Sequence, residues 1–253
     1  MSDRVEIGDA VLYRGDALRI LPTLDRVDLL FTDPPFELFK TREFIWSYDH
    51  ACPEHWHNIV MSKFPYTGMV QREFAERPWP LVSEYIWHFT DMSSFRASYM
   101  PLIHHETISV FSGRKDAIDL DRIRQPHRRS LAAEPQFKTA KSRGKQGKDL
   151  YWQQSEKGAW KSSVIICQRS LTGDMQDKDT TQPVGVKPVE MLMGLLPAYG
   201  DGVILDPFMG SGSAAIVAAL TGRPYIGIEV DPDYFALAVR RLEDFHRNGD
   251  LFV

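Results

Sequence analysis

An acidic residue followed by two prolines and an aromatic ring stands at the end of an apolar segment. Asp33-Pro34-Pro35-Phe36 follows Val27–Phe31, whose near-continuous apolar side chains are typical of a parallel strand buried on both faces. The prolines end such a strand because neither can donate a backbone hydrogen bond. A carboxylate and a backbone carbonyl could each accept one N–H of an amino group conjugated to a nucleobase, which frees the delocalised lone pair of that nitrogen. Phe36 offers a flat face on which a base can stack. The tetrapeptide therefore indicates chemistry on an amino group, with an ordinary proline-terminated strand end as the alternative.

A second segment places two glycines between a strand and a helix. Asp206–Ser213, with the sequence DPFMGSGS, follows the strand predicted at Val203–Leu205 and precedes the small-residue helix predicted at Ala214–Leu220. Gly210 and Gly212 let the backbone approach a ligand closely and expose amide hydrogens at the start of the helix. The segment favours a ligand site, and the alternative is a tight turn with close helix packing.

Glu229 adds a carboxylate to this second segment. It ends the next predicted strand, Tyr225–Glu229, about 20 residues further on, where a carboxylate can accept both hydroxyls of a ribose. Ala215 stands where the dinucleotide fingerprint has its third glycine, and the segment lacks the lysine of a P-loop. These features favour a cofactor that contains a nucleoside.

Strands and helices alternate at both ends of the chain, whereas the middle is irregular. Open α/β sheets bind ligands at the carboxyl ends of their strands, which is where both motifs are expected to lie. The other predicted elements are the strands Val11–Tyr13, Ser83–Phe89 and Thr107–Phe111, an apolar run at Ser163–Cys167, and helices from Ala17 to about Leu24, over Val189–Leu196 and from Pro232 to about Phe245.

Composition is that of an ordinary globular protein. Of the 253 residues, 43% are hydrophobic and 25% are charged, which disfavours disorder as the main state. The chain has too few cysteines, Cys52 and Cys167, for a disulfide framework, so a reducing cytoplasm is expected. A polar N-terminus predicts no signal peptide, and no apolar run is long enough to predict a membrane span.

The charge is distributed unevenly along the chain. Between Arg122 and Lys148 there are nine lysines and arginines and one acid, Glu134, although the whole chain has a net charge of −4. A basic strip on an acidic body indicates local contact with a polyanion, and a solvated loop is the alternative.

Taken together, the motifs resemble those of the S-adenosylmethionine-dependent DNA amino-methyltransferases. The resemblance rests on Asp33-Pro34-Pro35-Phe36, on Lys187-Pro188 and on Asp206-Pro207-Phe208-x-Gly210-x-Gly212. In particular the chain resembles the permuted group, in which the DPP-aromatic loop precedes the FxGxG loop. The resemblance covers roughly residues 5–36 and 184–245, and His105-Glu106 with Thr107–Phe111 is similar to a later strand of the same family.

This resemblance implies an α/β fold with a doubly wound, mostly parallel, Rossmann-like sheet in circularly permuted order. Residues 1–112 and 184–253 are then expected to form one discontinuous catalytic domain. Residues 113–183 occupy the place of an inserted target-recognition region.

The resemblance also implies roles for individual residues. Asp33 and the carbonyl of Pro34 would orient the target amino group, Pro35 would stiffen the loop, and Phe36 would stack on a flipped base. The methyl group would pass by direct in-line attack, without metal or covalent intermediate. The expected residues of the S-adenosylmethionine site are Asp16, Lys187, Pro188, Asp206, Phe208, Gly210, Ser211, Gly212, Ser213 and Glu229.

The first residue of the catalytic motif bears on the target base. Members that act on adenine N6 usually have Asp there and those that act on cytosine N4 usually have Ser, so Asp33 favours adenine in DNA. Cytosine N4, and RNA adenine N6, stay open as alternatives. Cytosine-C5 methylation needs a nucleophilic cysteine, typically after proline, whereas here Cys52 precedes Pro53. A catalytically silent binding module and a nucleotide-binding oxidoreductase are rival hypotheses from other classes.

The basic strip supplies the expected contacts with double-stranded DNA. A cognate restriction endonuclease acting on the same site is a candidate partner, and a monomer and a homodimer both fit. Base-reading side chains cannot be chosen among Arg128, Arg129, Gln153 and Gln154. The expected phosphate contacts are Arg128, Arg129, Lys138, Lys141, Arg143, Lys145 and Lys148.

Four metal-ligating residue types lie close together at His50, Cys52, His55 and His57. Their spacing is not that of a zinc finger and no second half follows, so no metal is predicted. The expectation is a loop that covers the mouth of the active site or contacts DNA.

Overall fold

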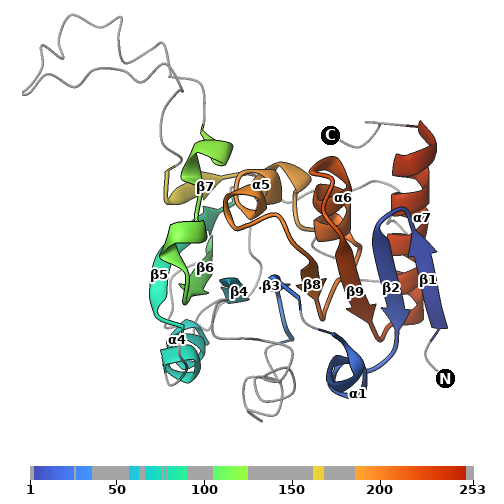
Figure 1. Cartoon of the computed structure of the whole chain (residues 1–253), viewed down its shortest axis with the longest axis horizontal. Coiled ribbons are helices and arrows are strands. Elements are labelled where there is room, and N and C mark those ends of the chain that lie inside the picture. The colour runs from blue at the N-terminus through green and yellow to red at the C-terminus, as the bar shows by residue number, and fades with distance from the viewer. Residues whose placement is uncertain are drawn as a thin grey trace, which may run out of the picture.

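The computed structural model describes residues 3–25, 27–35, 57–62, 66–75, 77, 79–89, 105–124, 162–167 and 186–248. Within these residues the strands form one nine-stranded sheet in the order β1-β2-β9-β8-β3-β4-β6-β5-β7 (Figure 1). The strands are β1 (Asp3–Ile7), β2 (Ala10–Arg14), β3 (Leu29–Thr32), β4 (His57–Ser62), β5 (Leu81–His88), β6 (His105–Ser112), β7 (Val164–Ile166), β8 (Ile204–Asp206) and β9 (Tyr225–Glu229).

Five neighbouring strands in the middle of the sheet run parallel. β2, β9, β8, β3 and β4 all point the same way, whereas β1 and β6 are antiparallel to their neighbours and β7 is parallel to β5. Every residue of β3, β4 and β8 is buried, as expected for strands covered on both faces. The carboxyl ends of the five parallel strands therefore meet along one edge of the sheet.

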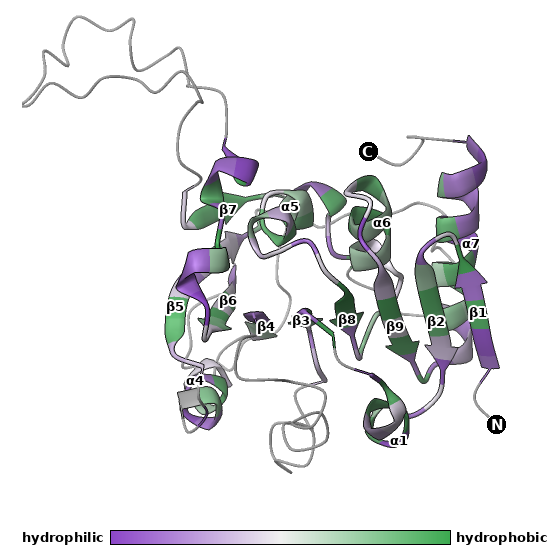
Figure 2. Ribbon diagram, in the orientation of Figure 1, coloured by the Kyte–Doolittle hydropathy of each residue, from purple (hydrophilic) through white to green (hydrophobic). Residues whose placement is uncertain are grey.

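Helices cover both faces, which makes the fold doubly wound. One core cluster packs α5 (Val189–Met193), α6 (Ser213–Leu220) and α7 (Pro232–Asn248) on the sheet, and the other packs α1 (Ala17–Ile20) and α4 (Thr67–Ala75). Figure 1 shows α5 and α6 on the side opposite α1 and α4. Figure 2 shows that α6 is apolar, consistent with its burial against both the sheet and α7, whereas α7 carries many hydrophilic residues.

Segments from the two ends of the chain alternate in the sheet. β2 pairs with β9, placing Arg14 opposite Glu229, and β3 pairs with β8, placing Leu30 opposite Leu205. The catalytic motif after β3 and the glycine loop after β8 consequently start from neighbouring strands. The predicted α/β, doubly wound, mostly parallel fold is confirmed.

β7 joins the sheet although it lies within residues 113–183, where a target-recognition region is expected. This strand, predicted only as an apolar run inside residues 113–183, pairs with β5 and is the last strand of the sheet. The 3-10 helix η3 (Leu120–Ile123) likewise packs against the 3-10 helix η6 (Leu196–Ala198). Both elements lie within residues 113–183 of the chain and contact the sheet or the elements beside it.

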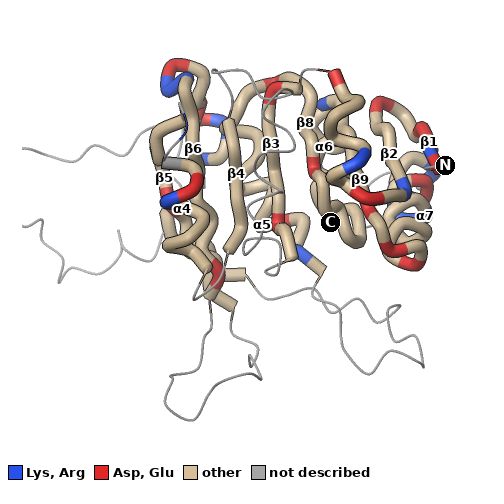
Figure 3. The backbone as a smooth tube through the Cα atoms, turned by 90° about the horizontal axis from the view of Figure 1, so that it is seen from below, with Lys and Arg blue, Asp and Glu red and all other residues tan. Residues whose placement is uncertain are grey.

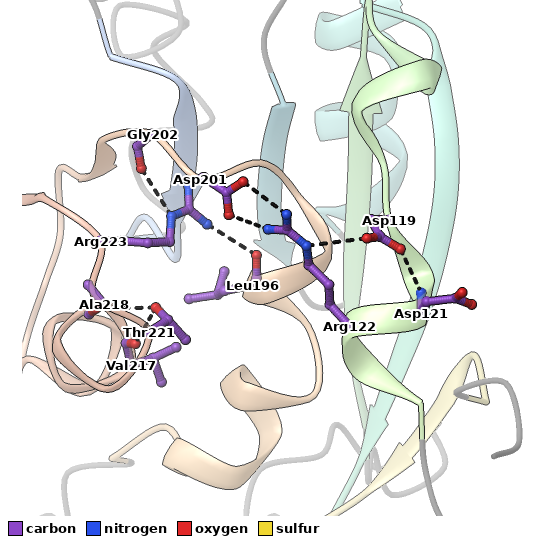
Figure 4. A network of polar contacts seen from close by, with 10 residues as sticks. All are labelled: Asp119, Asp121, Arg122, Leu196, Asp201, Gly202, Val217, Ala218, Thr221 and Arg223. Atoms are coloured by element: carbon purple, nitrogen blue, oxygen red, sulfur yellow. Dashed lines mark hydrogen bonds and ion pairs between the residues drawn. The ribbon is translucent and has the colours of Figure 1, made fainter. Parts of the chain in front are cut away.

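A polar network closes the edge of the sheet where the parallel strands begin. Arg122 of η3 donates to Asp201 and Asp119, and buried Arg223 donates through Nε to the Gly202 carbonyl at 3.0 Å and through Nη1 to the Leu196 carbonyl at 3.3 Å (Figure 4). These bonds tie η3, η6 and the turn before β9 together. The network stabilises the edge opposite the strand ends that carry the motifs.

His57 lies at this opposite edge as well. It is the first residue of β4 and is buried, and its ring packs edge-on to Tyr199 with a centroid distance of 5.7 Å. Burial lowers the pKa of the His57 imidazole, with Arg223 and Arg114 adding to the effect. For His57 the expectation of a loop over the active-site mouth is therefore wrong, because this residue starts a central strand. His50, Cys52 and His55 lie outside the described residues.

The described residues contain neither a candidate membrane span nor a cluster of metal ligands. None of the helices there is both long and apolar enough to cross a membrane. No group of three or more His, Cys, Asp or Glu side chains in that part of the chain is arranged to hold a metal ion.

Candidate active site

The carboxyl ends of four parallel strands surround a pocket of about 580 Å³. Asp16 follows β2, Asp33 follows β3, Asp206 ends β8 and Glu229 ends β9, and all four residues line this pocket. Figure 3 shows that the strands β3 and β4 are uncharged along most of their length and that acidic residues lie at strand ends. A site at this edge is what the parallel topology predicts.

The glycine loop approaches the pocket because its backbone adopts conformations that side chains disfavour. Gly210 and Gly212 have φ values of 53° and 78°, both in the left-handed region. A Cβ added to Gly210 would meet no atom within 4 Å, whereas one added to Gly212 would lie 3.0 Å from the Cβ of Ala238 on α7. Gly210 therefore faces open space that a ligand can fill, and Gly212 permits close packing behind the loop.

Glu229 holds the glycine loop in place. Its Oε2 accepts a hydrogen bond from the Gly210 amide and its Oε1 accepts one from the Asp231 amide, both at 2.9 Å. Burial raises the pKa of the Glu229 carboxyl, and the backbone N–H groups oppose that rise. Since each carboxylate oxygen can accept more than one hydrogen bond, these contacts leave capacity for hydroxyl groups of a ligand.

Asp206 is the most deeply buried acid of the pocket, with 3% of its surface exposed. It accepts hydrogen bonds from the Phe208 amide at 3.2 Å and from the Tyr225 hydroxyl at 3.3 Å. Burial raises the pKa of the Asp206 carboxyl to about 8, and the negative charge of Asp33 adds to the rise. Asp206 is consequently poised to ionise when a positive charge enters the pocket.

Asp33 belongs to a charged triplet at the end of β3. Lys187, which precedes α5, forms an ion pair with Asp33 Oδ2, and its Nζ lies 3.5 Å from Glu106 Oε2 on β6. The same ammonium lies 5.6 Å from the ring centroid of Trp87. Burial disfavours the charged form of Lys187, but the two carboxylates outweigh it, and the pKa of Lys187 is raised. The triplet is net negative and borders the pocket through Asp33 and Lys187.

Arg241 supports the glycine loop from behind. This α7 side chain donates from Nη1 to the Ser211 carbonyl at 2.6 Å and to the Ser211 hydroxyl at 3.0 Å. Sequence reasoning missed Arg241 and Glu106 as site residues, because each acts through a contact between elements that are distant in the chain. The signal for Glu106 was its place directly before the predicted strand Thr107–Phe111.

Most of the predicted site residues that the structure describes come together here. Pro34 and Pro188 do not line the pocket, and Gly212 packs behind it. Phe36 and the seven predicted DNA contacts lie outside the described residues. The pocket-lining residues among those predicted are Asp16, Asp33, Pro35, Lys187, Asp206, Phe208, Gly210, Ser211, Ser213 and Glu229.

The chemistry of the lining favours a cationic ligand that carries hydroxyl groups. Five acids border the pocket: Asp16, Asp33, Asp206, Glu229 and Asp231. Glu229 already accepts the hydrogen bond of the Gly210 amide. A phosphate at the glycine loop would meet this carboxylate instead of free amides, which argues against a dinucleotide or nucleotide triphosphate. The volume suits a ligand the size of a nucleoside joined to an amino acid.

One family of known proteins matches most of this chain. The family model N6_N4_Mtase, described as DNA methylase, matches residues 27–240. Because the match spans most of the chain, this protein belongs to that DNA methylase family.

Individual relatives resemble the chain over most of its length. The Type II methyltransferase M.ScaI of Streptomyces caespitosus is 28% identical over 269 residues, which cover 94% of this chain and 83% of the relative. The crystal structure of the M1.HpyAVI–SAM complex has a TM-score of 0.62 at 19% identity, covering 91% of this chain and 98% of that one. The structure of the cytosine-N4-specific PvuII DNA methyltransferase has a TM-score of 0.61 at 14% identity. The match covers 97% of this chain and 95% of that one. At these identities, the two solved structures show that this chain shares their fold.

Proposed function

We propose that this DNA methylase transfers a methyl group from S-adenosylmethionine to the N6 amino group of adenine in DNA. The observation that carries the proposal is the shared pocket of Asp33 and the glycine loop, which start from the neighbouring strands β3 and β8. An amino group held at Asp33 would therefore face the ligand that the glycine loop and Glu229 hold. The order of the two motifs along the chain supports membership of the permuted group.

The pocket residues suit the parts of S-adenosylmethionine. Glu229 would accept the ribose hydroxyls, Gly210 offers space beside the loop, and Asp206 would face positive charge. When bound, this donor supplies a methyl group made electrophilic by a sulfonium. Asp16, which caps α1 by accepting from the Leu18 amide at 2.9 Å, would lie near the adenine ring of the cofactor.

Asp33 would act on the target amino group. Its carboxylate and the carbonyl of Pro34 each accept one N–H, which draws the nitrogen toward tetrahedral geometry and frees its lone pair for in-line attack. Positive charge develops on the nitrogen during the attack, and an anionic Asp33 stabilises it. Because a paired base cannot reach the pocket from within the duplex, base flipping accompanies the reaction, with Phe36 as the stacking partner.

The choice of adenine over cytosine rests on the type of residue 33. The fold does not discriminate, because the similar PvuII enzyme is cytosine-N4-specific. Cytosine N4 in DNA is the second candidate, and adenine N6 in RNA is the third. The target-recognition region would lie within residues 113–183, with the seven basic residues on phosphates. A cognate restriction endonuclease would be a partner at the level of the DNA site, by analogy with Type II enzymes such as M.ScaI.

Nucleoside analysis tests the proposed function directly. The protein is incubated with methyl-labelled S-adenosylmethionine and unmodified DNA, and the digested DNA is separated into nucleosides. We expect label in N6-methyldeoxyadenosine. Label in N4-methyldeoxycytidine would correct the base, label in a parallel RNA reaction alone would correct the substrate, and label in neither would contradict the proposed function.

A further inference from the structure

Glu106 completes the charged triplet at Asp33, although none of the roles proposed above falls to it. It lies in β6, whose antiparallel pairing with β4 places Thr107 opposite Ser62 at the same edge of the sheet as Asp33. Glu106 thereby reaches Lys187 without itself lining the pocket. Its position raises the question of what a second carboxylate on Lys187 does.

Substrate binding would break the ion pair between Asp33 and Lys187. Asp33 can accept an N–H from the target amino group only if its carboxylate turns away from the ammonium or shares an oxygen with it. The Asp33, Lys187 and Glu106 side chains are 28%, 19% and 15% exposed, so water compensates poorly for a lost partner. An ammonium left unpaired in this position would oppose binding of the amino group.

We propose that Glu106 is a positioning residue. It becomes the ion-pair partner of Lys187 when the target amino group donates a hydrogen bond to Asp33. The inference rests on the proposed function. Glu106 Oε2 is already 3.5 Å from Lys187 Nζ, so a small movement of the lysine suffices for a close ion pair. Lys187 keeps one anionic partner throughout, and Asp33 becomes available as an acceptor.

Trp87 contacts the Lys187 ammonium that would move between the two carboxylates. Its ring lies beside the Lys187 ammonium and is fixed because its Nε1 donates to the Cys167 carbonyl at 2.9 Å. In the β5–β6 register Trp87 stands opposite Glu106. A cation over an aromatic face retains part of its stabilisation while it changes carboxylate partners.

The test compares two DNA duplexes that differ by one amino group. One carries the methylation site found by nucleoside analysis, and in the other the target base is replaced by the same ring without its exocyclic amino group. Affinities are measured by fluorescence anisotropy in the presence of S-adenosylhomocysteine, so no turnover is needed. Glu106→Gln should weaken binding of the amino-bearing duplex about tenfold and leave the other duplex within about twofold of wild type.

Controls separate this inference from a structural role and from the proposed function. Glu84→Gln, on the exposed face of the neighbouring strand β5, should change neither affinity. S-adenosylhomocysteine should bind Glu106→Gln within about threefold of wild type, because Glu106 does not line the pocket. If Glu106→Gln fails to fold, Glu106→Asp should show a smaller loss of affinity that is again confined to the amino-bearing duplex.

Equal losses on the two duplexes, or no loss on either, would overturn the role of Glu106 while wild-type methylation still stands. A wild-type protein that methylates no nucleic acid would instead contradict the proposed function itself.

Discussion

The acids of the pocket differ because their surroundings differ. Among the described residues, Asp206 is enclosed and accepts hydrogen bonds from one amide and one hydroxyl, whereas Asp33 pairs with a cation and Glu229 accepts from two backbone amides. A buried carboxyl without a cation retains its proton to higher pH. Ligand charge should therefore be coupled to the protonation of Asp206.

Affinity for S-adenosylmethionine should rise with pH up to about 8 and then level off. The positive ligand stabilises the Asp206 carboxylate, so below the pKa of the free protein its binding must release a proton, at a limiting slope of about tenfold per pH unit. Calorimetry from pH 6 to 9 in buffers of different ionisation enthalpy measures both affinity and proton release. Asp206→Asn should bind more weakly and without this pH dependence. A wild-type affinity that stays flat over the range would contradict the coupling.

The sequence predicted single residues where local pattern and strand ends coincide. Asp33 and Glu229 could be placed because each follows or ends a strand with a clear apolar signature, and parallel strands bring such ends together. Glu106 and Arg241 could not be placed. Their roles arise from contacts with Lys187 and Ser211, which lie 81 and 30 residues away in the chain.

Among the elements, the glycine loop is held between β9 and α7. Glu229 binds the amide of Gly210 from the strand, and Arg241 binds the carbonyl of Ser211 from the helix. Ala238 packs against Gly212 on the same helical face as Arg241. The orientation of α7 therefore determines the shape of the loop that the cofactor contacts.

Arg241→Met should weaken S-adenosylmethionine binding about tenfold, because a hydrogen bond from a charged donor contributes about 1.5–3 kcal/mol. At saturating cofactor the turnover number should stay close to wild type, since Arg241 does not line the pocket. Titration of the cofactor and steady-state kinetics separate the two effects. Arg240→Met, on the exposed side of the same helix, is the matched control. A fall in turnover with unchanged cofactor affinity would contradict the role of Arg241 in holding the glycine loop.

Elements with a strong apolar pattern could be predicted, and those with mixed patterns could not. β9 has the bounds predicted, whereas the helix expected over Val189–Leu196 ends at Met193, where Gly194 and then Pro197 interrupt it. β1 was missed because the sequence DRVEI is an edge strand with charged residues. β4 was missed because it follows a stretch rich in aromatics and prolines, although all six of its residues are buried.

Across the whole molecule, the central feature is that the two ends of the chain share one sheet. β2 and β3 flank β9 and β8 in the sheet. Asp33 from the first part of the chain and the glycine loop from the last part therefore line one pocket. This arrangement could be predicted because the motifs and their order resemble a known family. The pairing of β7 with β5 could not be predicted, because so short a strand gains its stability from its neighbour rather than from its own sequence.

The most direct test of this arrangement is methyl transfer by Asp33→Ala, measured beside its affinity for S-adenosylmethionine. Labelled methyl incorporation into DNA should fall at least about 100-fold, because Asp33 orients the amino group, while the dissociation constant of the cofactor stays within about threefold. Asp25→Ala, an exposed acid near the start of β3, should behave as wild type in both measurements. Turnover by Asp33→Ala close to that of the wild type would contradict the account, since the acid at the end of β3 would then have no part in the reaction.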